Sequence, residues 1–148
     1  MVIEELRWWH IPEVLTIEDD LFGVEQWSAA MFWGELAQGH YYRIATEDNQ
    51  ILGYAGLAVL SPDEATVCNI AVRRDHQRRG IGEALLVDLL EEAERHGARR
   101  IVLEVAADNE PAQNLYRRYG FTPAGIRRGY YQPSNTDAVT MIRSEATT

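Results

Sequence analysis

The chain has 148 residues, of which 46% are apolar and 25% are charged, and this is enough for one globular domain spanning residues 1–148 with its own core. A net charge of −9 argues against nucleic acid as the main partner, and no apolar run is long enough to cross a bilayer. The N-terminus lacks the pattern of a signal peptide, the single cysteine cannot form an internal disulfide, and the four histidines show no metal-ligand spacing, so we expect a cytoplasmic protein without a metal.

The first half of the chain is predicted to begin with a strand at residues 2–8 and two helices at residues 12–22 and 29–38. Pro12 suits the first turn of one helix, and Ser28 can cap the other. Alternating apolar residues between turn signals predict three more strands, at residues 41–47, 50–60 and 64–72.

The second half is predicted to alternate helices and strands, at residues 81–96 (helix), 100–105 (strand), 109–119 (helix), 121–131 and 137–143 (strands). The first of these helices has an apolar face at helical spacing, formed by Ile81, Leu85, Leu86, Leu89, Leu90 and Ala93. The order β-α-α-β-β-β-α-β-α-β-β predicts an α/β fold, with a mixed sheet and helices on its faces.

A basic, glycine-containing turn joins the strand at residues 64–72 to the helix at residues 81–96. Gly80 and Gly82 let the backbone approach a ligand closely, and the first turn of the helix has N–H groups without intrahelical partners. Four arginines surround this turn: Arg73, Arg74, Arg78 and Arg79. The pattern predicts a site for phosphate or pyrophosphate. A P-loop is excluded because Glu83 and Ala84 follow Gly82, and a dinucleotide fingerprint is excluded because Leu85 takes the place of a small residue.

The remaining pattern, Gln77-x-x-Gly80-x-Gly82, resembles the pyrophosphate loop of the Gcn5-related N-acetyltransferases (GNAT), and the order of elements resembles that fold over essentially the whole chain. Segments typical of the RimI-type branch, which acetylates the N-terminal alanine of a small-subunit ribosomal protein, occur at residues 63–72, 103–105, 120–121, 126–131 and 137–141. The resemblance implies acetyl-CoA as cosubstrate and a ribosomal-protein N-terminal peptide as acceptor. It implies coenzyme contacts at Ile70, Ala71, Val72, Gln77, Arg78, Arg79, Gly80, Ile81, Gly82 and Asn109. Asn109 also suits a plain helix cap.

Amide formation from an amine and a thioester needs a base for the amine and a proton donor for the leaving sulfur. Glu104 lies in an apolar strand, where a carboxylate must be paired, desolvated or used. It is either the base or the partner of a nearby arginine. Tyr116 lies in the helix at residues 109–119 and is either the acid or a core tyrosine with its hydroxyl bonded to the backbone. The resemblance implies the catalytic role for both residues.

The acceptor side carries three aromatic candidates, Trp27, Tyr130 and Tyr131, which the resemblance places on the two rims of a peptide groove. Each also suits packing on its own loop.

Cys68 suggests an acetyl-cysteine intermediate, although a strand cysteine is usually a small core hydrophobe. The chain departs from the RimI-type pattern at two places, where proline is missing beside Trp27 and where Ala106 stands for arginine, and both fall near the acceptor side.

Two other functions fit the same residues less well. The same fold could act on a small amine, an antibiotic or a lysine side chain. A non-catalytic acyl-CoA-binding domain would need neither Glu104 nor Tyr116. We expect no direct nucleic-acid or membrane partner, and a monomer or weak dimer, since the last strands could leave an exposed edge.

Overall fold

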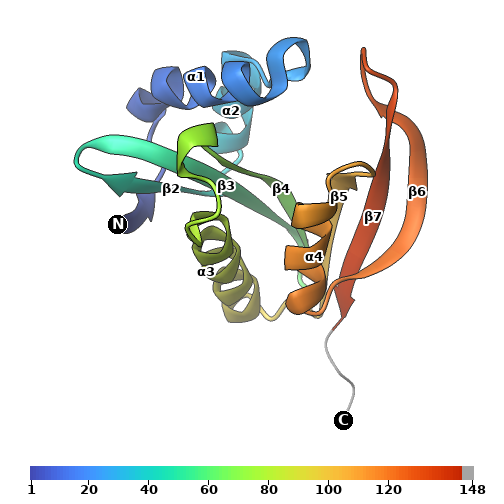
Figure 1. Cartoon of the computed structure of the whole chain (residues 1–148). Coiled ribbons are helices and arrows are strands. Elements are labelled where there is room, and N and C mark those ends of the chain that lie inside the picture. The colour runs from blue at the N-terminus through green and yellow to red at the C-terminus, as the bar shows by residue number, and fades with distance from the viewer. Residues whose placement is uncertain (145–148) are drawn as a thin grey trace.

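Seven strands form one mixed sheet in the order β1-β2-β3-β4-β5-β7-β6 (Figure 1). The structure, a computed structural model, describes residues 1–144, so the last four residues of the predicted domain lie outside it. The strands are β1 (Val2–Glu5), β2 (Tyr41–Glu47), β3 (Gln50–Ser61), β4 (Glu64–Val72), β5 (Arg100–Ala106), β6 (Thr122–Tyr131) and β7 (Thr136–Ser144). The predicted α/β fold with a mixed sheet is confirmed.

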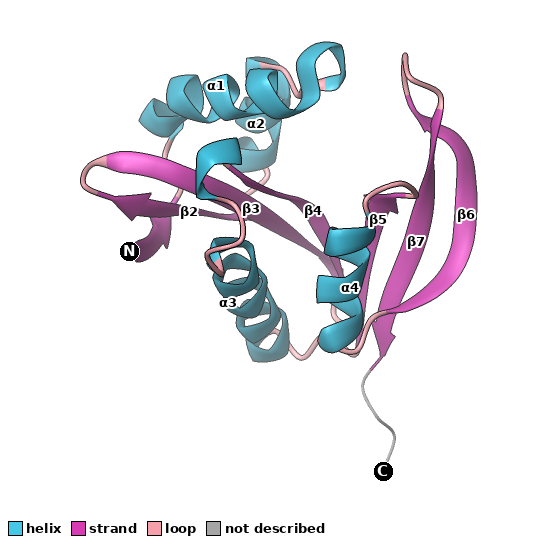
Figure 2. Ribbon diagram, in the orientation of Figure 1, coloured by secondary structure: helices cyan, strands magenta, loops and turns pink. Residues whose placement is uncertain are grey.

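Two helices cover each face of this sheet (Figure 2). The helices α1 (Ile11–Phe22) and α2 (Ala29–Ala37) pack on one face through residues such as Val14 and Phe32. The helices α3 (Ile81–Arg95) and α4 (Glu110–Arg118) pack on the other. All six apolar residues predicted to form the inner face of α3 are buried. Within residues 1–144, no helix is long and apolar enough to cross a membrane.

The first strand is shorter than predicted. The sequence indicates a strand to residue 8, but β1 ends at Glu5 and a 3-10 helix occupies Trp8–His10. The chain turns there because the Arg7 N–H donates to Nδ1 of His10 at 2.8 Å, and the His10 N–H donates to the Arg7 carbonyl at 2.9 Å. Pro12 then occupies the first turn of α1, as predicted.

The sheet opens between its two central parallel strands. Among the described residues, β4 and β5 pair at three positions, where residues 64–66 lie beside residues 100–102. Beyond this point β4 continues along β3, and β5 continues along β7, so the two strands move apart (Figure 1). Cys68 is an extra residue in β4 at the opening, because Asn69 pairs with Gly56 while Val67 pairs with Leu57. We call the space between residues 67–72 of β4 and residues 103–106 of β5 the strand gap.

Candidate active site

Glu104 reaches the strand gap from the α1/α2 face of the sheet. Its strand neighbours Leu103 and Val105 are buried in the core beneath α3 and α4. Because side chains alternate along a strand, Glu104 points to the opposite face. Its side chain is 22% exposed.

Both oxygens of the Glu104 carboxylate have partners. The Thr140 hydroxyl, from the residue opposite on β7, donates to Oε2 at 2.6 Å. The Arg127 guanidinium on β6 donates to Oε1 at 3.3 Å. The predicted pairing with a nearby arginine therefore exists. Because Arg127 is 57% exposed, and exposed ion pairs contribute only about 0–1 kcal/mol, another cation can take its place at Oε1. The role of Glu104 as base stays a prediction.

Tyr116 approaches from the α4 side of the sheet. Its ring is buried and meets Phe121 edge-on, with ring centroids 5.9 Å apart. Burial alone raises the pKa of the Tyr116 hydroxyl to about 12. Within residues 1–144 this hydroxyl has no hydrogen-bond partner, so the alternative of a hydroxyl bonded to the backbone is not found. The phenol keeps its proton and is available to a ligand.

Gln113 holds α4 against β5, a role that no sequence pattern indicates. Its side chain is buried, and its Nε2 donates to the carbonyls of Ala106 and Ala107, both at 3.1 Å. Gln113 lies one turn before Tyr116 in the same helix, and Ala106 ends the strand that carries Glu104. The two candidate catalytic residues are thus positioned by a single short connection.

The predicted phosphate turn joins β4 to the N-terminus of α3. Gln77 folds back on the strand end, where its Nε2 donates to the Val72 carbonyl at 3.1 Å. Arg78 and Gly80 both have left-handed backbone conformations, with φ of 66° and 81°. Glycine at residue 80 adopts the left-handed backbone conformation without strain because it has no Cβ.

The start of α3 fits an anionic group. Gly80 is the N-cap and provides no side-chain cap. The first helical hydrogen bond runs from the Ala84 N–H to the Gly80 carbonyl, so within residues 1–144 the N–H groups of residues 81–83 remain free as donors. A Cβ on Gly82 would meet only the Val72 side chain, at 3.6 Å, so packing within the protein does not require a glycine there. Space next to this backbone is therefore open to a ligand.

The arginines around this turn are less available than the sequence indicates. Three of them form ion pairs with carboxylates: Arg73 with Asp75 (3.6 Å), Arg74 with Asp20 (3.3 Å) and Arg79 with Glu47 (3.4 Å). Among the described residues, Arg78 forms no ion pair and is exposed. The N–H groups of α3 and Arg78 are therefore available to an anion without loss of an ion pair, and the exposed pairs of Arg74 and Arg79 cost little to exchange, so the role of these arginines stays a prediction.

The backbone of Ile70, Ala71 and Val72 lines the strand gap. These residues pair with β3 on one side and have no described strand partner on the other. The buried amide oxygen and nitrogen of Asn69 likewise have no hydrogen-bond partner within the described chain. Free polar groups thus line the gap and fit an extended amide-containing ligand.

Asn109 caps α4, accepting the Ala112 N–H at 3.3 Å, so its capping role is confirmed and its coenzyme contact stays a prediction.

Two loops face each other on the acceptor side. Residues 23–28, between α1 and α2, meet the β6–β7 hairpin where the Ser134 hydroxyl donates to Glu25 at 2.9 Å. Trp27 packs on Phe32 of α2, with ring centroids 5.2 Å apart, and not only on its own loop, so its role at the acceptor groove stays a prediction. Tyr130 and Tyr131 meet edge-on at 5.0 Å in the hairpin. Burial, followed by the charges of Tyr130 and Glu104, raises the pKa of Tyr131 to about 12, so this ring lies near the catalytic candidates.

Cys68 is a poor nucleophile. Burial is the largest cause that raises the pKa of its thiol to about 12, and the charge of Glu35 adds to it. The thiol therefore stays protonated, which argues against an acetyl-cysteine intermediate. Among residues 1–144, no three His, Cys, Asp or Glu side chains gather as a metal site.

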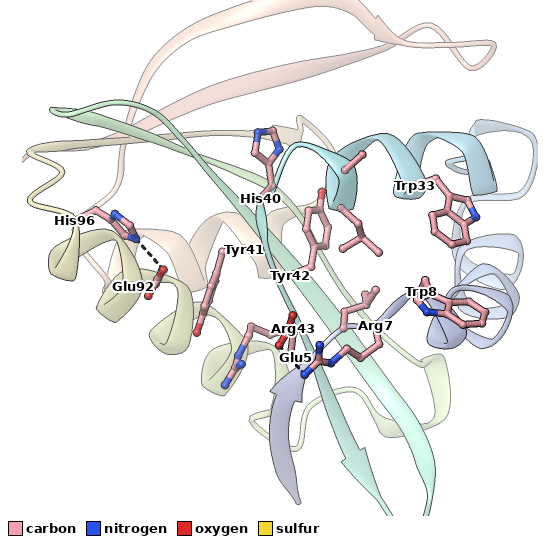
Figure 3. A pocket seen from close by; sticks show the side chains of 14 residues that line it. Glu5, Arg7, Trp8, Trp33, His40, Tyr41, Tyr42, Arg43, Glu92 and His96 are labelled. Atoms are coloured by element: carbon pink, nitrogen blue, oxygen red, sulfur yellow. Dashed lines mark hydrogen bonds and ion pairs between the residues drawn. The ribbon is translucent and has the colours of Figure 1, made fainter.

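A cavity of about 740 Å³ lies away from the strand gap (Figure 3). It opens between the start of β2 and the ends of α2 and α3, and Trp8, Trp33 and Tyr41 line it. Glu92 and His96 on its wall already pair with each other at 2.9 Å. None of the site residues predicted from the sequence is among the described residues that line this cavity, so it is distinct from the candidate active site.

Comparison with known proteins decides the family. The model of the acetyltransferase (GNAT) family matches residues 3–121. The chain belongs to this family. It is therefore an N-acetyltransferase, and GNAT enzymes use acetyl-CoA, which agrees with the free N–H groups of α3 and the polar edge of β4.

Named relatives cover most of the chain. It is 43% identical to the "N-alpha-acetyltransferase RimI" of Mycobacterium tuberculosis, over 86% of this chain and 82% of that protein. It is 39% identical to the "[Ribosomal protein bS18]-alanine N-acetyltransferase" of Escherichia coli K12, over 81% of this chain and 86% of that protein. The crystal structure of the Escherichia coli ribosomal-protein-S18-alanine N-acetyltransferase superposes with a TM-score of 0.87 at 33% identity, covering 99% of this GNAT chain and 95% of that one. The predicted resemblance to the RimI-type enzymes is confirmed.

Proposed function

We propose that this GNAT enzyme transfers the acetyl group of acetyl-CoA to the N-terminal alanine of ribosomal protein bS18. The observation that carries the proposal is the identity of 39–43%, over at least four fifths of both chains, to relatives named for N-terminal acetylation. The strand gap supports it, since it has a carboxylate on one face of the sheet and a protonated phenol on the other. We also propose that the enzyme is a single domain, that it is cytoplasmic, and that it acts as a monomer or weak dimer.

In the proposed reaction, the acceptor enters from the α1/α2 face and its ammonium displaces Arg127 from Oε1 of Glu104. Glu104 accepts a proton from the ammonium, directly or through water, and the free amine attacks the thioester carbonyl. The new C–N bond forms, the C–S bond breaks, and Tyr116 gives its proton to the departing sulfur. The amide nitrogen gives its excess proton, through water, to the Tyr116 oxygen, and Glu104 releases its own proton to solvent. A backbone N–H near Ala71 and Val72 polarises the carbonyl. The products are an amide and a thiol.

The coenzyme binds to the turn at residues 77–82 and to the backbone of residues 70–72 along the strand gap. The N–H groups at Ile81 and Gly82, with Arg78, hold the pyrophosphate. The open edge of Ile70, Ala71 and Val72 receives the amide groups of the pantetheine arm. Gln77, Arg79, Gly80 and Asn109 shape this surface. Trp27, Tyr130 and Tyr131 form the opposite walls of the acceptor groove.

Intact-mass measurement tests the acceptor. The enzyme is incubated with acetyl-CoA and a peptide that begins with alanine, and separately with the same peptide carrying a blocked α-amine and a free lysine. We expect a gain of one acetyl group on the first peptide only, because an α-amine with a pKa of about 8 loses its proton far more readily than a lysine with a pKa of about 10.4. Acetylation of the blocked peptide would indicate a lysine acetyltransferase, and acetylation of neither peptide would direct the search to small amines.

The pH dependence follows from the pKa of Tyr116. Because burial raises this pKa to about 12, the proton donor remains protonated throughout the usual assay range. Because the acceptor binds as its ammonium and Glu104 removes the proton on the enzyme, we expect kcat at saturating peptide to stay level up to about pH 10. Initial rates measured from pH 6 to 10 at saturating acetyl-CoA and peptide check this profile. A fall in rate between pH 8 and 10 would contradict Tyr116 as the donor.

A further inference from the structure

Glu18 on α1 is a buried carboxylate that has no role in the proposed acetyl transfer. Among the described residues it is the one buried charged side chain, at 2% exposure. It lies among apolar residues of the α1/α2 face, such as Ile17 and Phe32. Burying a carboxylate is costly unless hydrogen bonds compensate it. A leucine of similar size would fill the same space at lower cost, so the polar contacts of Glu18 need an explanation.

Both oxygens of Glu18 accept hydrogen bonds from different parts of the fold. The buried hydroxyl of Tyr54, on β3, donates to Oε1. The backbone N–H of Trp27 donates to Oε2 at 2.9 Å. Burial raises the pKa of the Glu18 carboxyl, while the hydrogen bonds from Tyr54 and Trp27 act in the opposite direction. The carboxylate thus joins a strand of the sheet to the loop between α1 and α2.

The two ends of this connection lie at the candidate site. Tyr54 is the residue opposite Ala71, whose backbone lines the strand gap. Trp27 belongs to the loop at residues 23–28, which also contacts the β6–β7 hairpin through Glu25 and Ser134. A second bond, from Gln26 to Asp19 at 2.9 Å, ties the same loop to α1 at its exposed surface. The buried carboxylate of Glu18 therefore helps to set the position of the loop at residues 23–28, which we call the acceptor loop, relative to the strand gap.

We infer that Glu18 is a positioning residue for the acceptor, because it holds the backbone at Trp27 at a fixed distance from the strand gap. The inference rests on the proposed function for the identity of the acceptor. It assigns Glu18 no contact with either substrate. Glu18 therefore affects how well the peptide is held, and we expect it to change acetyl-CoA binding little, because neither of its two hydrogen-bond partners, Tyr54 and Trp27, belongs to the turn at residues 77–82.

The test replaces Glu18 with glutamine, which has nearly the same shape but offers one acceptor oxygen in place of two. Tyr54 and Trp27 then compete for a single acceptor. We expect the KM for the alanine-terminated peptide to rise about tenfold, with kcat within about threefold, because one hydrogen bond that holds the loop is lost. The Kd for acetyl-CoA, measured by calorimetry, should stay within about twofold. Tyr54→Phe removes the hydroxyl that donates to Glu18, and it should also raise the KM for the peptide.

Glu13→Gln is the matched control. Glu13 lies on the same helix and also accepts a backbone N–H, that of Ile51 at 2.7 Å, but it holds the start of β3 and not the acceptor loop. This variant should leave the KM for the peptide unchanged. If Glu18→Gln leaves that KM unchanged, or raises the Kd for acetyl-CoA equally, the inference is wrong and Glu18 is a general structural residue.

Amide hydrogen exchange at Trp27 separates this inference from the proposed function. Exchange at the Trp27 N–H should be about tenfold faster in Glu18→Gln than in the unmodified protein or Glu13→Gln, whichever acceptor the enzyme uses. An unmodified enzyme that does not acetylate the peptide would disprove the proposed substrate. Unchanged exchange at Trp27 in Glu18→Gln would instead disprove the positioning role.

Discussion

Replacing Glu104 with glutamine is expected to lower kcat for the alanine-terminated peptide by about a thousandfold, as is typical for loss of a general base. Glutamine keeps the size of the side chain and can still accept from Thr140, which lies 2.6 Å away in the unmodified protein. It cannot take a proton from the acceptor ammonium. Steady-state rates of thiol release measure the effect, and the Kd for acetyl-CoA should be unchanged.

Two further variants separate the base from an ion pair that only stabilises the sheet. Arg127→Gln breaks the 3.3 Å contact with Glu104 but retains the carboxylate, and kcat should stay within about fivefold. Glu92→Gln removes a carboxylate that is paired with Arg95 at 2.8 Å far from the strand gap, and it should have no effect on kcat. If Arg127→Gln lowers kcat as much as Glu104→Gln, the ion pair and not the base accounts for the loss.

Tyr116→Phe is expected to lower kcat by about a hundredfold, because the departing sulfur then takes its proton from water. The ring still fills its place against Phe121, so the fold and the Kd for acetyl-CoA should be preserved. Circular dichroism and calorimetry check these two points, and stopped-time assays of thiol release give the rate.

Tyr119→Phe is the control for this variant. Tyr119 follows α4 directly and is only half-buried, and its ring packs beside the same core. Loss of its hydroxyl should leave kcat unchanged. Full activity of Tyr116→Phe would remove Tyr116 from the reaction and leave it as a core tyrosine whose hydroxyl has no role in catalysis.

The parts of the fold that were predictable are those determined by local sequence. The apolar spacing along α3 follows from helical periodicity, and all its predicted core residues are buried. Ser28 caps α2 by accepting the Met31 N–H at 3.2 Å, as its residue type indicates. The prediction failed at residues 6–8, because the side chain of His10 stabilises a turn that apolar patterning does not reveal.

The parts that were not predictable depend on pairs of residues distant in the chain. Arg74 meets Asp20 across 54 residues, and Arg79 meets Glu47 across 32, so the sequence could not reveal that these arginines are paired. The support of Glu104 by Thr140 depends on the register between β5 and β7. The burial of Glu18 depends on how α1 packs, although an acidic residue on the apolar side of a helix is a signal that could have been noticed.

The narrow junction between β4 and β5 has a consequence for how the molecule forms. Strands β2, β3 and β4 pair with their neighbours in sequence through short turns, and such local contacts favour early formation, whereas Val2 of β1 pairs with the distant Thr46 of β2. β5 joins these strands through a parallel crossover and three residue pairs, and it brings Glu104, with α4 and Tyr116 directly after it. The catalytic pair is therefore assembled only after β5 and α4 have joined the strands that precede them in the chain. A chain synthesised only as far as α3 has the turn proposed to bind the pyrophosphate and the acceptor loop at residues 23–28, but it lacks the β6–β7 hairpin, Glu104 and Tyr116.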